Sequence, residues 1–429
     1  MSTTTSSKAT TRRGWRVAIA AGLASYIDAG SIVGTGSALV IMQGTIGLDP
    51  AQIGQLSALL TVAIAVGAIF GGRLGDKFGR RRVFLITLSA YAVAALLLAF
   101  VPNVGLLYIG LIVIGVAGGA DLPVSLAMVA ESAPEDKRGK MVAFSHLFWI
   151  FGILGVIIVS IFFGNSGALG VAVIFGHLAV VAIIGILLRI SIPESKMWTE
   201  SIRLPEQSGK PDPTRIRTLF RAPLIAPMVA TGLFYALVNI AANTNGQFAT
   251  FLYVNYAGVD VSTASLFGLV VLALGAVGVL IMMRVADRHS RNRTFVVAAI
   301  VGLVAIAVPL TFGISVWTLV TFGILGAISS AIAGEPIYKV WSQELFPTEH
   351  RSTAQGVTIA FARVVAAAVA LVTPLVVAVG PALLFGFLLV TSAAAYAIGI
   401  FWVFKLRTFL ASPAHPDDTE STEVGSRLL

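Results

Sequence analysis

The side chains best able to do chemistry in this sequence are a few ionisable groups inside long apolar runs. If these runs cross a bilayer, each such group costs several kcal/mol unless it is paired or hydrated, so each is a candidate functional residue. A carboxylate or an imidazole could take up and release a proton there, and a guanidinium could bind a carboxylate. The group consists of Asp28, Asp121, His146, His177, Glu335, Lys339 and Arg363.

Three carboxylates are candidates for proton coupling. Asp28, in the first apolar run, is the favoured one, and the alternative is a structural carboxylate that is hydrogen-bonded to helix ends. The stretches "GGADLPV" at 118–124 and "AGEPIYK" at 333–339 each combine an acid with Pro, which is tolerated where a membrane helix lines a cavity. Asp121 and Glu335 are therefore predicted to face a central pathway, with a packed role inside the helices as the alternative.

Amides and aromatic side chains are the candidate ligands of a neutral solute. In "NIAANTNGQF", helical spacing puts Asn239 and Asn243 on one face, and likewise Asn243 and Gln247. Amides bind hydroxyl groups, but these could instead form hydrogen bonds between helices. Aromatic residues that could wall a solute, or else pack or anchor the chain at the membrane surface, are Tyr26, Trp149, Tyr235, Tyr338 and Trp341.

The two basic side chains inside the apolar runs are expected at different depths in the bilayer. Arg363 lies about 18 Å of helix rise past Arg351, near the middle of a bilayer. It could hold a carboxylate of the solute, or it could be neutralised by Asp28 or Glu335. Lys339 could reach the membrane surface and contribute little to a binding pocket.

The two histidines differ in what is expected of them. His146 could bind a solute hydroxyl or relay a proton, whereas His177 is predicted to be a packing residue. The complete predicted solute-binding set is Tyr26, Asp28, Asp121, His146, Trp149, Asn239, Asn243, Gln247, Glu335, Tyr338 and Arg363.

The elements that must position these residues are membrane helices. A chain of 429 residues with 57% hydrophobic and only 11% charged residues lies outside the range of water-soluble domains. Its apolar runs are long enough for helices that cross a hydrocarbon core of about 30 Å, which takes roughly 20 residues each. The twelve predicted spans are 15–42, 51–71, 83–101, 105–130, 141–163, 169–190, 222–246, 262–283, 294–312, 315–341, 354–378 and 382–405.

The distribution of Lys and Arg predicts the orientation of these spans. Basic residues collect in the N-terminal tail, in alternate loops such as 72–82 and 284–293, and in the C-terminal tail, whereas the other loops contain none. Because basic loops stay cytoplasmic, both termini are expected in the cytoplasm of a cell-membrane protein. The net charge of +9 then reflects topology and not nucleic-acid binding, and the absence of Cys excludes disulfides and Cys-ligated zinc.

Two repeated motifs indicate that one unit of six helices occurs twice. The stretch "GRLGDKFGRRR" at 72–82 has a degenerate copy in "MRVADRHSRNR" at 283–293, and "ESAPEDKRG" returns, in outline, as "ELFPTEHRS". Both pairs have nearly the same separation, and an even number of spans gives the copies one orientation. The predicted organisation is a tail at 1–14, bundles at 15–190 and 222–408, a cytoplasmic linker at 191–221 and a tail at 409–429.

These motifs also resemble a known family. "GRLGDKFGRRR" is similar to the signature loop of the major facilitator superfamily, and the resemblance covers nearly the whole chain. "ESAPEDKRG", "PESKMW" at 193–198, "ELFPTEHR" and "DAGSIVG" at 28–34 resemble the sugar-porter branch. The resemblance implies an all-α membrane protein with twelve transmembrane helices in two pseudo-symmetric six-helix bundles.

The resemblance is incomplete at the residues that would bind the solute. His146 stands where sugar porters carry a sugar-binding Gln, and Asn243 resembles their seventh-helix Asn, but the preceding pair of glutamines is replaced. The fourth-helix Arg that pairs with an Asp like Asp28 is replaced by Leu111, so Asp121, His146 or Arg363 could take its place. Arg363 resembles an Arg of organic-anion members of the wider family.

The loop motifs predict charge networks that close the cytoplasmic face and break when it opens, although they could be positive-inside charges that happen to pair. The predicted gate residues are Gly72, Asp76, Arg80, Glu131, Arg138, Glu194, Asp287, Arg291, Glu344 and Arg351.

The sequence therefore predicts a secondary active transporter and not an enzyme. We expect proton-coupled symport of a sugar or polyol by a monomer that works by alternating access without a cofactor. Transport of an organic anion is the alternative, and drug efflux or a non-transporting sensor are less favoured.

Overall fold

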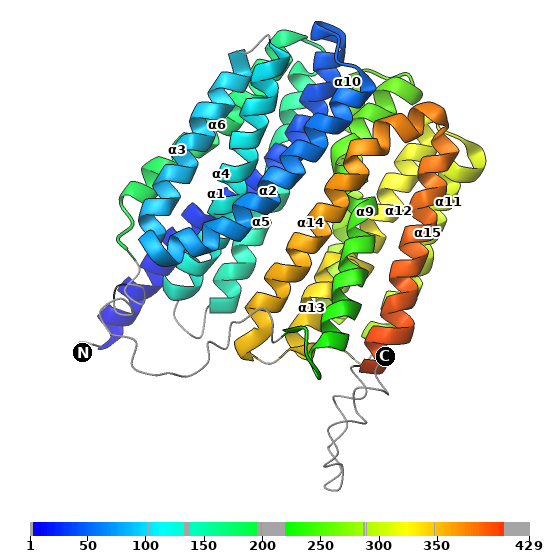
Figure 1. Ribbon diagram of the computed structural model, residues 1–429. Helices are drawn as coiled ribbons and strands as arrows, with labels where there is room; N and C mark the ends of the chain where they lie inside the picture. The colour runs from blue at the N-terminus through cyan, green and yellow to red at the C-terminus, as the bar shows by residue number, and fades with distance from the viewer. Residues whose placement is uncertain are drawn as a thin grey trace, which may run out of the picture. The chain divides into compact units, whose positions relative to one another are not determined.

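The computed structural model describes residues 3–100, 103–132, 138–194, 199, 219–285, 288, 290–346 and 348–406. Within these ranges the regular elements are all helices (Figure 1). They are α1 (Thr3–Ile46), α2 (Pro50–Phe78), α3 (Arg80–Phe100), α4 (Val104–Ser132), α5 (Arg138–Phe163), α6 (Ala168–Ile190), α9 (Ile225–Tyr256), α10 (Val261–Val285), α11 (Arg291–Phe312), α12 (Val316–Ala333), α13 (Glu335–Leu345), α14 (Thr348–Val379), α15 (Pro381–Ala397) and a π-helical turn, η2 (Ile398–Val403).

The helices confirm the predicted all-α membrane architecture. In the described part of the chain, 11 helical segments are long and apolar enough to cross a membrane, and the shorter apolar segment Leu147–Phe163 supplies the twelfth span. The seventh span differs from its prediction, because α9 continues to Tyr256 instead of ending near residue 246. The tenth span is interrupted at Gly334, where α12 ends and α13 begins with Glu335 and Pro336.

Local sequence signals account for several helix ends. Asp49 accepts a hydrogen bond from the backbone amide of Gln52, whose side chain in turn accepts one from the Asp49 amide, so a capping box starts α2. Ser315 and Thr318 start α12 in the same way. Gly79 separates α2 from α3 with a φ of 97°, a conformation that favours glycine.

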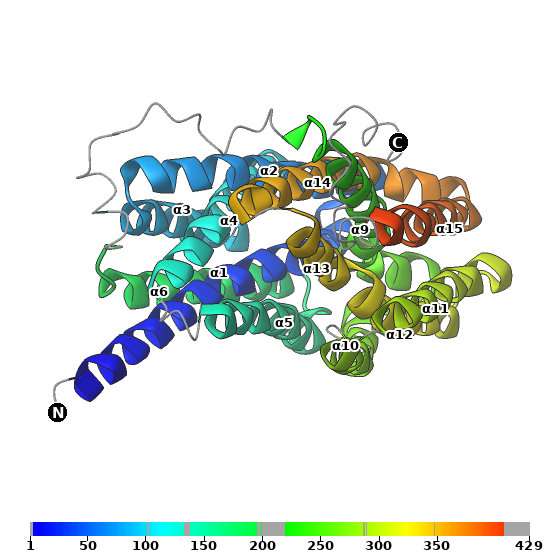
Figure 2. The same ribbon diagram turned by 90° about the horizontal axis from the view of Figure 1, so that it is seen from below.

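The chain forms two compact units whose boundary does not follow the sequence midpoint. Unit 1 contains residues 1–208 together with 246–266, and unit 2 contains residues 209–245 and 267–429. The second half of α9 and the start of α10 therefore belong with the first six helices. Within unit 1, α2 packs on α4, α3 on α6, and α1 on α5, α4 and α6, as both views of the ribbon show (Figure 2).

Glycines allow α2 and α4 to pack at backbone distance. A Cβ atom added to Gly67 or Gly71 would collide with the backbone of Val116 or Ala120, and one added to Gly119 would collide with the carbonyl of Ile64. Small residues at such positions are how membrane helices gain van der Waals contact without a hydrophobic driving force. This interface sets the position of Asp121, two residues after Gly119.

An aromatic cluster forms the centre of unit 2. The ring of Trp341 on α13 lies 4.8 Å from that of Phe234 on α9 and 5.2 Å from that of Phe295 on α11, centroid to centroid. All three residues are buried, so Trp341 packs inside the unit instead of walling an open space. The cluster anchors α13 although α13 does not continue α12.

Candidate functional site

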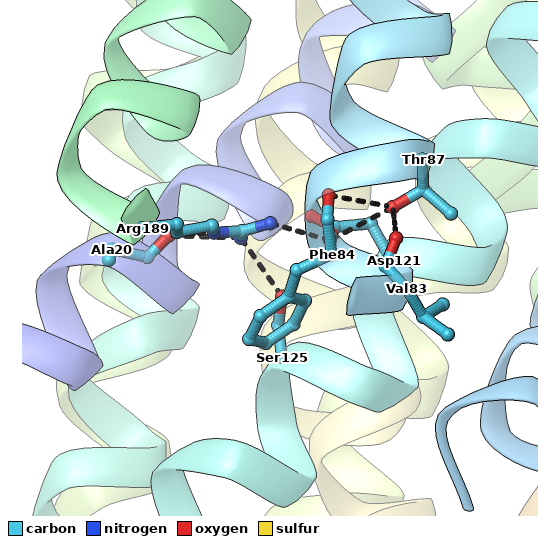
Figure 3. A network of polar contacts seen from close by, with 7 residues as sticks. All are labelled: Ala20, Val83, Phe84, Thr87, Asp121, Ser125 and Arg189. Carbon is cyan, nitrogen blue, oxygen red and sulfur yellow. Dashed lines mark hydrogen bonds and ion pairs between the residues drawn. The ribbon is translucent and has the colours of Figure 1, made fainter. Parts of the chain in front are cut away.

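A fully buried ion pair joins α4 and α6 in unit 1 (Figure 3). Arg189 Nη1 lies 2.5 Å from Asp121 Oδ1, and both side chains are 1% exposed. Arg189 also donates from Nη2 to Ser125 Oγ at 3.0 Å, and from Nη2 and Nε to the carbonyl of Ala20 on α1 at 3.0 and 3.2 Å. Its guanidinium carbon lies 4.4 Å from the centre of the Phe84 ring on α3. The Arg189 side chain thus connects α6 with three other helices, α1, α3 and α4.

This pair changes the assignment of Asp121. The sequence predicts that Asp121 faces a central pathway, but in this structure the carboxylate is enclosed and its charge is matched by Arg189. Thr87 on α3 adds a long hydrogen bond of 3.5 Å to Asp121 Oδ1. Arg189 is not among the predicted functional residues, although it is a charged residue inside the sixth predicted span at 169–190.

Asp28 lies in a buried, hydroxyl-rich part of unit 1. It is 3% exposed on α1, and Ser31 follows on the same face one turn later. Ser31 Oγ lies 2.6 Å from the Ile27 carbonyl and 2.6 Å from Tyr91 Oη on α3. The Tyr91 phenol is within electrostatic reach of the Asp28 carboxylate. Asp28 is thus a buried acid on α1, one turn from a pair of hydrogen-bonded hydroxyl groups.

Tyr26 and His177 form a polar pair between α1 and α6. His177 Nδ1 lies 2.8 Å from the Ile174 carbonyl, which can only accept, so Nδ1 donates and Nε2 is left to accept from Tyr26 Oη at 3.3 Å. His177 therefore has a specific partner and is more than a packing residue. Tyr26, predicted to bind solute, points toward α6 and Gly155 of α5. Trp149 is half-buried on α5, whereas the side chain of His146 lies outside the described part of the chain.

The amides of α9 are divided between the two units. Asn239 is half-buried and Asn243 is buried in unit 2, whereas Gln247 belongs to unit 1. Gln247 Nε2 donates to Thr61 Oγ1 on α2 at 2.7 Å, and its backbone packs directly against Gly36 on α1. Gln247 therefore joins helices, as the alternative for these amides predicts.

Glu335 is the centre of a charged cluster in unit 2. Its Oε1 lies 2.7 Å from Lys339 Nζ one turn later, and the two side chains are 41% and 45% exposed. Tyr235 on α9 forms a hydrogen bond with Glu335 and lies within electrostatic reach of both Glu335 and Arg363 of α14. Lys339 is thus an ion-pair partner in addition to any contact with the membrane surface. The Glu335–Lys339 ion pair thus lies at the start of α13, and Arg363 lies within electrostatic reach of the Tyr235 that bonds to Glu335.

Stacked tyrosines support this cluster from the core. The rings of Tyr235 and Tyr338 lie 4.1 Å apart at an angle of 13°, and the Tyr338 hydroxyl bonds to Thr358 of α14. Tyr338 is fully buried, so it connects α9, α13 and α14 instead of presenting its ring to an open space.

Some of the predicted gate residues form contacts within each unit. Arg291 at the start of α11 lies 2.8 Å from Glu344 of α13 in unit 2, and in unit 1 Glu194 accepts hydrogen bonds from the backbone amide of Arg81 at 3.1 and 3.2 Å. Arg80 is half-exposed at the first position of α3. For five other predicted gate residues the structure describes only that they lie in helices: Gly72, Asp76, Glu131, Arg138 and Arg351. Asp287 lies outside the described residues.

A hydrogen-bonded connection that the sequence did not predict links two turns of unit 1. Asp260, just before α10, accepts from Asn165 Nδ2 of the α5–α6 turn at 2.7 Å and from the Thr263 amide at 2.9 Å. Asn165 Oδ1 accepts from the Ser262 amide at 3.3 Å. These hydrogen bonds to the charged form lower the pKa of Asp260 to about 2.

The stabilising effect of this connection should depend on pH. Because the folded pKa lies below the unfolded value of about 3.9, Asp260 contributes stability that is present above pH ~4 and is lost as the pH falls through about 2. We expect the difference in thermal midpoint between the wild type and Asp260→Asn to be largest near neutral pH and to shrink between pH 4 and 2. A difference that stays constant over this range would contradict the assignment.

The comparisons with known proteins agree with the fold. The chain matches the family model described as the Major Facilitator Superfamily over residues 18–371. It is 33% identical over 367 residues to the minor myo-inositol transporter IolF of Bacillus subtilis, covering 84% of this chain and 83% of the relative. It is 25% identical over 325 residues to the putative niacin/nicotinamide transporter NiaP of the same organism, covering 74% and 77%. The crystal structure of a D-xylose–proton symporter matches with a TM-score of 0.73 at 17% identity, covering 91% of this chain and 97% of that one.

Proposed function

Because the chain belongs to the major facilitator superfamily and is therefore a multi-pass membrane transporter, we propose that it carries a small polyol or sugar together with a proton. The observation that carries the choice of solute is the 33% identity to a myo-inositol transporter over most of both chains. The half-buried amide of Asn239 in unit 2 supports a hydroxylated solute, since amides both donate to and accept from hydroxyl groups.

Asp28 is the proposed proton carrier. Its carboxylate lies inside a span in a buried place beside Ser31 and Tyr91, where a change of protonation alters the local charge in a low dielectric. Asp121 is assigned to structure because Arg189 holds its charge in place. Glu335 stays a secondary candidate, whose ion pair with Lys339 would have to open for it to take part.

Both chain ends are proposed to face the cytoplasm, since the basic residues collect in the same set of loops as the termini. The Arg291–Glu344 pair then lies on the cytoplasmic side, where it would hold α11 and α13 together during part of the transport cycle. The bundles at 15–190 and 222–408 would move as the two bodies of alternating access.

The proposal is tested by uptake of labelled myo-inositol, xylose and glucose into proteoliposomes with an imposed inward proton gradient. A gradient of about one pH unit supplies ~1.4 kcal/mol per proton, which corresponds to about tenfold accumulation at one proton per solute. We expect Asp28→Asn to abolish this accumulation, so that the solute reaches the same concentration inside and outside the proteoliposomes. Solute exchange should continue. Asp49→Asn, in a loop, is the matched control, and gradient-driven accumulation that survives Asp28→Asn would rule out coupling at this residue.

An organic anion is the second candidate solute, favoured by the charges around Glu335. Lys339 pairs with Glu335, and Arg363 lies within electrostatic reach of Tyr235, which bonds to Glu335. The guanidinium of Arg363 is well shaped to hold a solute carboxylate. In the same uptake assay, nicotinate and sugar acids distinguish the two candidates. Accumulation of carboxylates alone would overturn the polyol assignment.

A further inference from the structure

We infer that Lys339 is a specificity-determining residue, which donates a hydrogen bond to one hydroxyl group of the solute while its partner Glu335 accepts one from the neighbouring hydroxyl. The inference rests on the proposed function, because it presumes that the solute is a polyol or a sugar. The predicted solute-binding set contains Glu335 but not Lys339, which the sequence alone allows to reach the membrane surface instead.

The Lys339 side chain extends away from the C-terminal end of α13. That end carries Glu344, which pairs with Arg291 on the side proposed to be cytoplasmic. A lysine that reached for the membrane surface would extend in the same direction. Lys339 Nζ lies instead 2.7 Å from Glu335 Oε1, one turn back toward the break at Gly334. The ammonium group is therefore held inside the tenth span.

The ion pair is accessible although it lies within a span. The side chains of Glu335 and Lys339 are 41% and 45% exposed, and both residues belong to the segment 316–342, which is long and apolar enough to cross a membrane. Charged side chains inside a span face other polar groups or water, because contact with lipid tails is strongly unfavourable. The exposed side of the pair thus borders the kind of water-filled route that a transporter opens for its solute.

Another face of α13 is fixed to the core of unit 2. Tyr338 and Trp341 are fully buried on that face. The Tyr338 hydroxyl bonds to Thr358 of α14. Ser342 Oγ accepts a hydrogen bond from Gln355 Nε2 of the same helix at 3.0 Å. A contact residue on a helix anchored in this way keeps its position when a solute binds.

The chemistry of the pair suits two adjacent hydroxyl groups. An ammonium group has three N–H donors, and within the described part of the chain the Lys339 side chain has Glu335 as its polar partner. Neighbouring hydroxyls of a polyol are close enough together for one to accept from Nζ while the next donates to the carboxylate. A solute with a carboxylate in place of the two hydroxyls satisfies only the lysine and faces the negative charge of Glu335.

The test combines a substitution in the protein with the removal of one solute hydroxyl at a time. Proteoliposomes exchange whichever of labelled myo-inositol, xylose and glucose is taken up best, without a proton gradient, and its monodeoxy analogues compete. In the wild type we expect the loss of either of two adjacent hydroxyls to weaken competition about tenfold, the effect of one hydrogen bond to a charged group. In Lys339→Met, the loss of one of these two should change competition by less than about twofold, because its partner is already absent.

Two further variants control for the removal of a charge. Lys339→Met leaves the Glu335 carboxylate without its cation, whereas the double variant Glu335→Gln with Lys339→Met is neutral and should be equally insensitive to the loss of that hydroxyl. Lys405→Met removes an exposed lysine that follows η2 and is the matched control. It should respond to every analogue as the wild type does.

The outcomes separate this inference from the proposed function. If the wild type exchanges the solute but every analogue has the same relative effect in Lys339→Met, the pair is an ordinary ion pair of a helix and the inference is wrong. A Lys339→Met protein that differs only in its maximal rate of exchange leads to the same conclusion. If the wild type accepts none of the three solutes, the proposed choice of solute fails, and the assignment of Lys339 to a hydroxyl fails with it.

Discussion

Replacement of Arg189 with Ala is expected to destabilise the protein by about 3–5 kcal/mol. The substitution would leave the Asp121 carboxylate buried without its cation, and removal of one partner of a buried ion pair typically has an effect of this size. It would also remove the hydrogen bonds to the Ala20 carbonyl and Ser125. The measurement is the thermal unfolding midpoint of the purified protein in detergent, together with the yield of monodisperse protein.

Two further variants identify the cause of this destabilisation. Arg284→Ala removes an exposed Arg near the end of α10 and is expected to have little effect. The double variant Asp121→Leu with Arg189→Met removes both charges and should recover much of the lost stability, because apolar side chains of similar size can replace a buried pair. An Arg189→Ala protein as stable as Arg284→Ala would show that the pair does not hold the helices together.

Substitution of Gly119 by Val should have the second large effect. A Cβ atom at this position would overlap the backbone of Ile64 on α2, and backbone cannot rotate away as a side chain does. The helices would have to separate along the interface that carries Asp121, so we expect a loss at or above the upper end of the usual overpacking range, about 3 kcal/mol. Folded yield and thermal midpoint measure it.

Gly176→Val in α6 is the matched control, because a Cβ atom added there would meet no described atom of another helix within 4 Å. Gly119→Ala should lie between the two, since its methyl group makes the same collision without the β-branched bulk. Equal stability of Gly119→Val and Gly176→Val would contradict the close packing of α2 and α4.

Much of the fold was predictable from the sequence because a bilayer restricts which backbone structures can cross it. Each backbone group inside the hydrocarbon needs a partner within its own segment, so apolar runs of sufficient length become helices. Close packing of α2 on α4 follows in the same local way from small residues, because Gly67, Gly71 and Gly119 leave no side chain between the two backbones. The break at Gly334 was not predicted as such, although Pro336, which lacks an amide donor, stood beside it.

The candidate site was predictable by residue type but not by partner. Asp28, Asp121, Glu335 and Arg363 stood out because charges are rare in apolar runs. The pairing of Asp121 with Arg189, of Tyr26 with His177 and of Glu335 with Tyr235 depends on how helices far apart in the chain face each other. The spacing of residues along the sequence does not specify how two distant helices are rotated toward each other.

The sequence by itself thus determined that this protein is a twelve-span transporter with a small set of buried charges, because helix length and the cost of charge in lipid are local properties. Only the tertiary structure decided which of those charges support the fold and which remain candidates for coupling. The physical reason is that a buried carboxylate takes its role from the groups that face it, and for Asp121 that group is Arg189, on another helix.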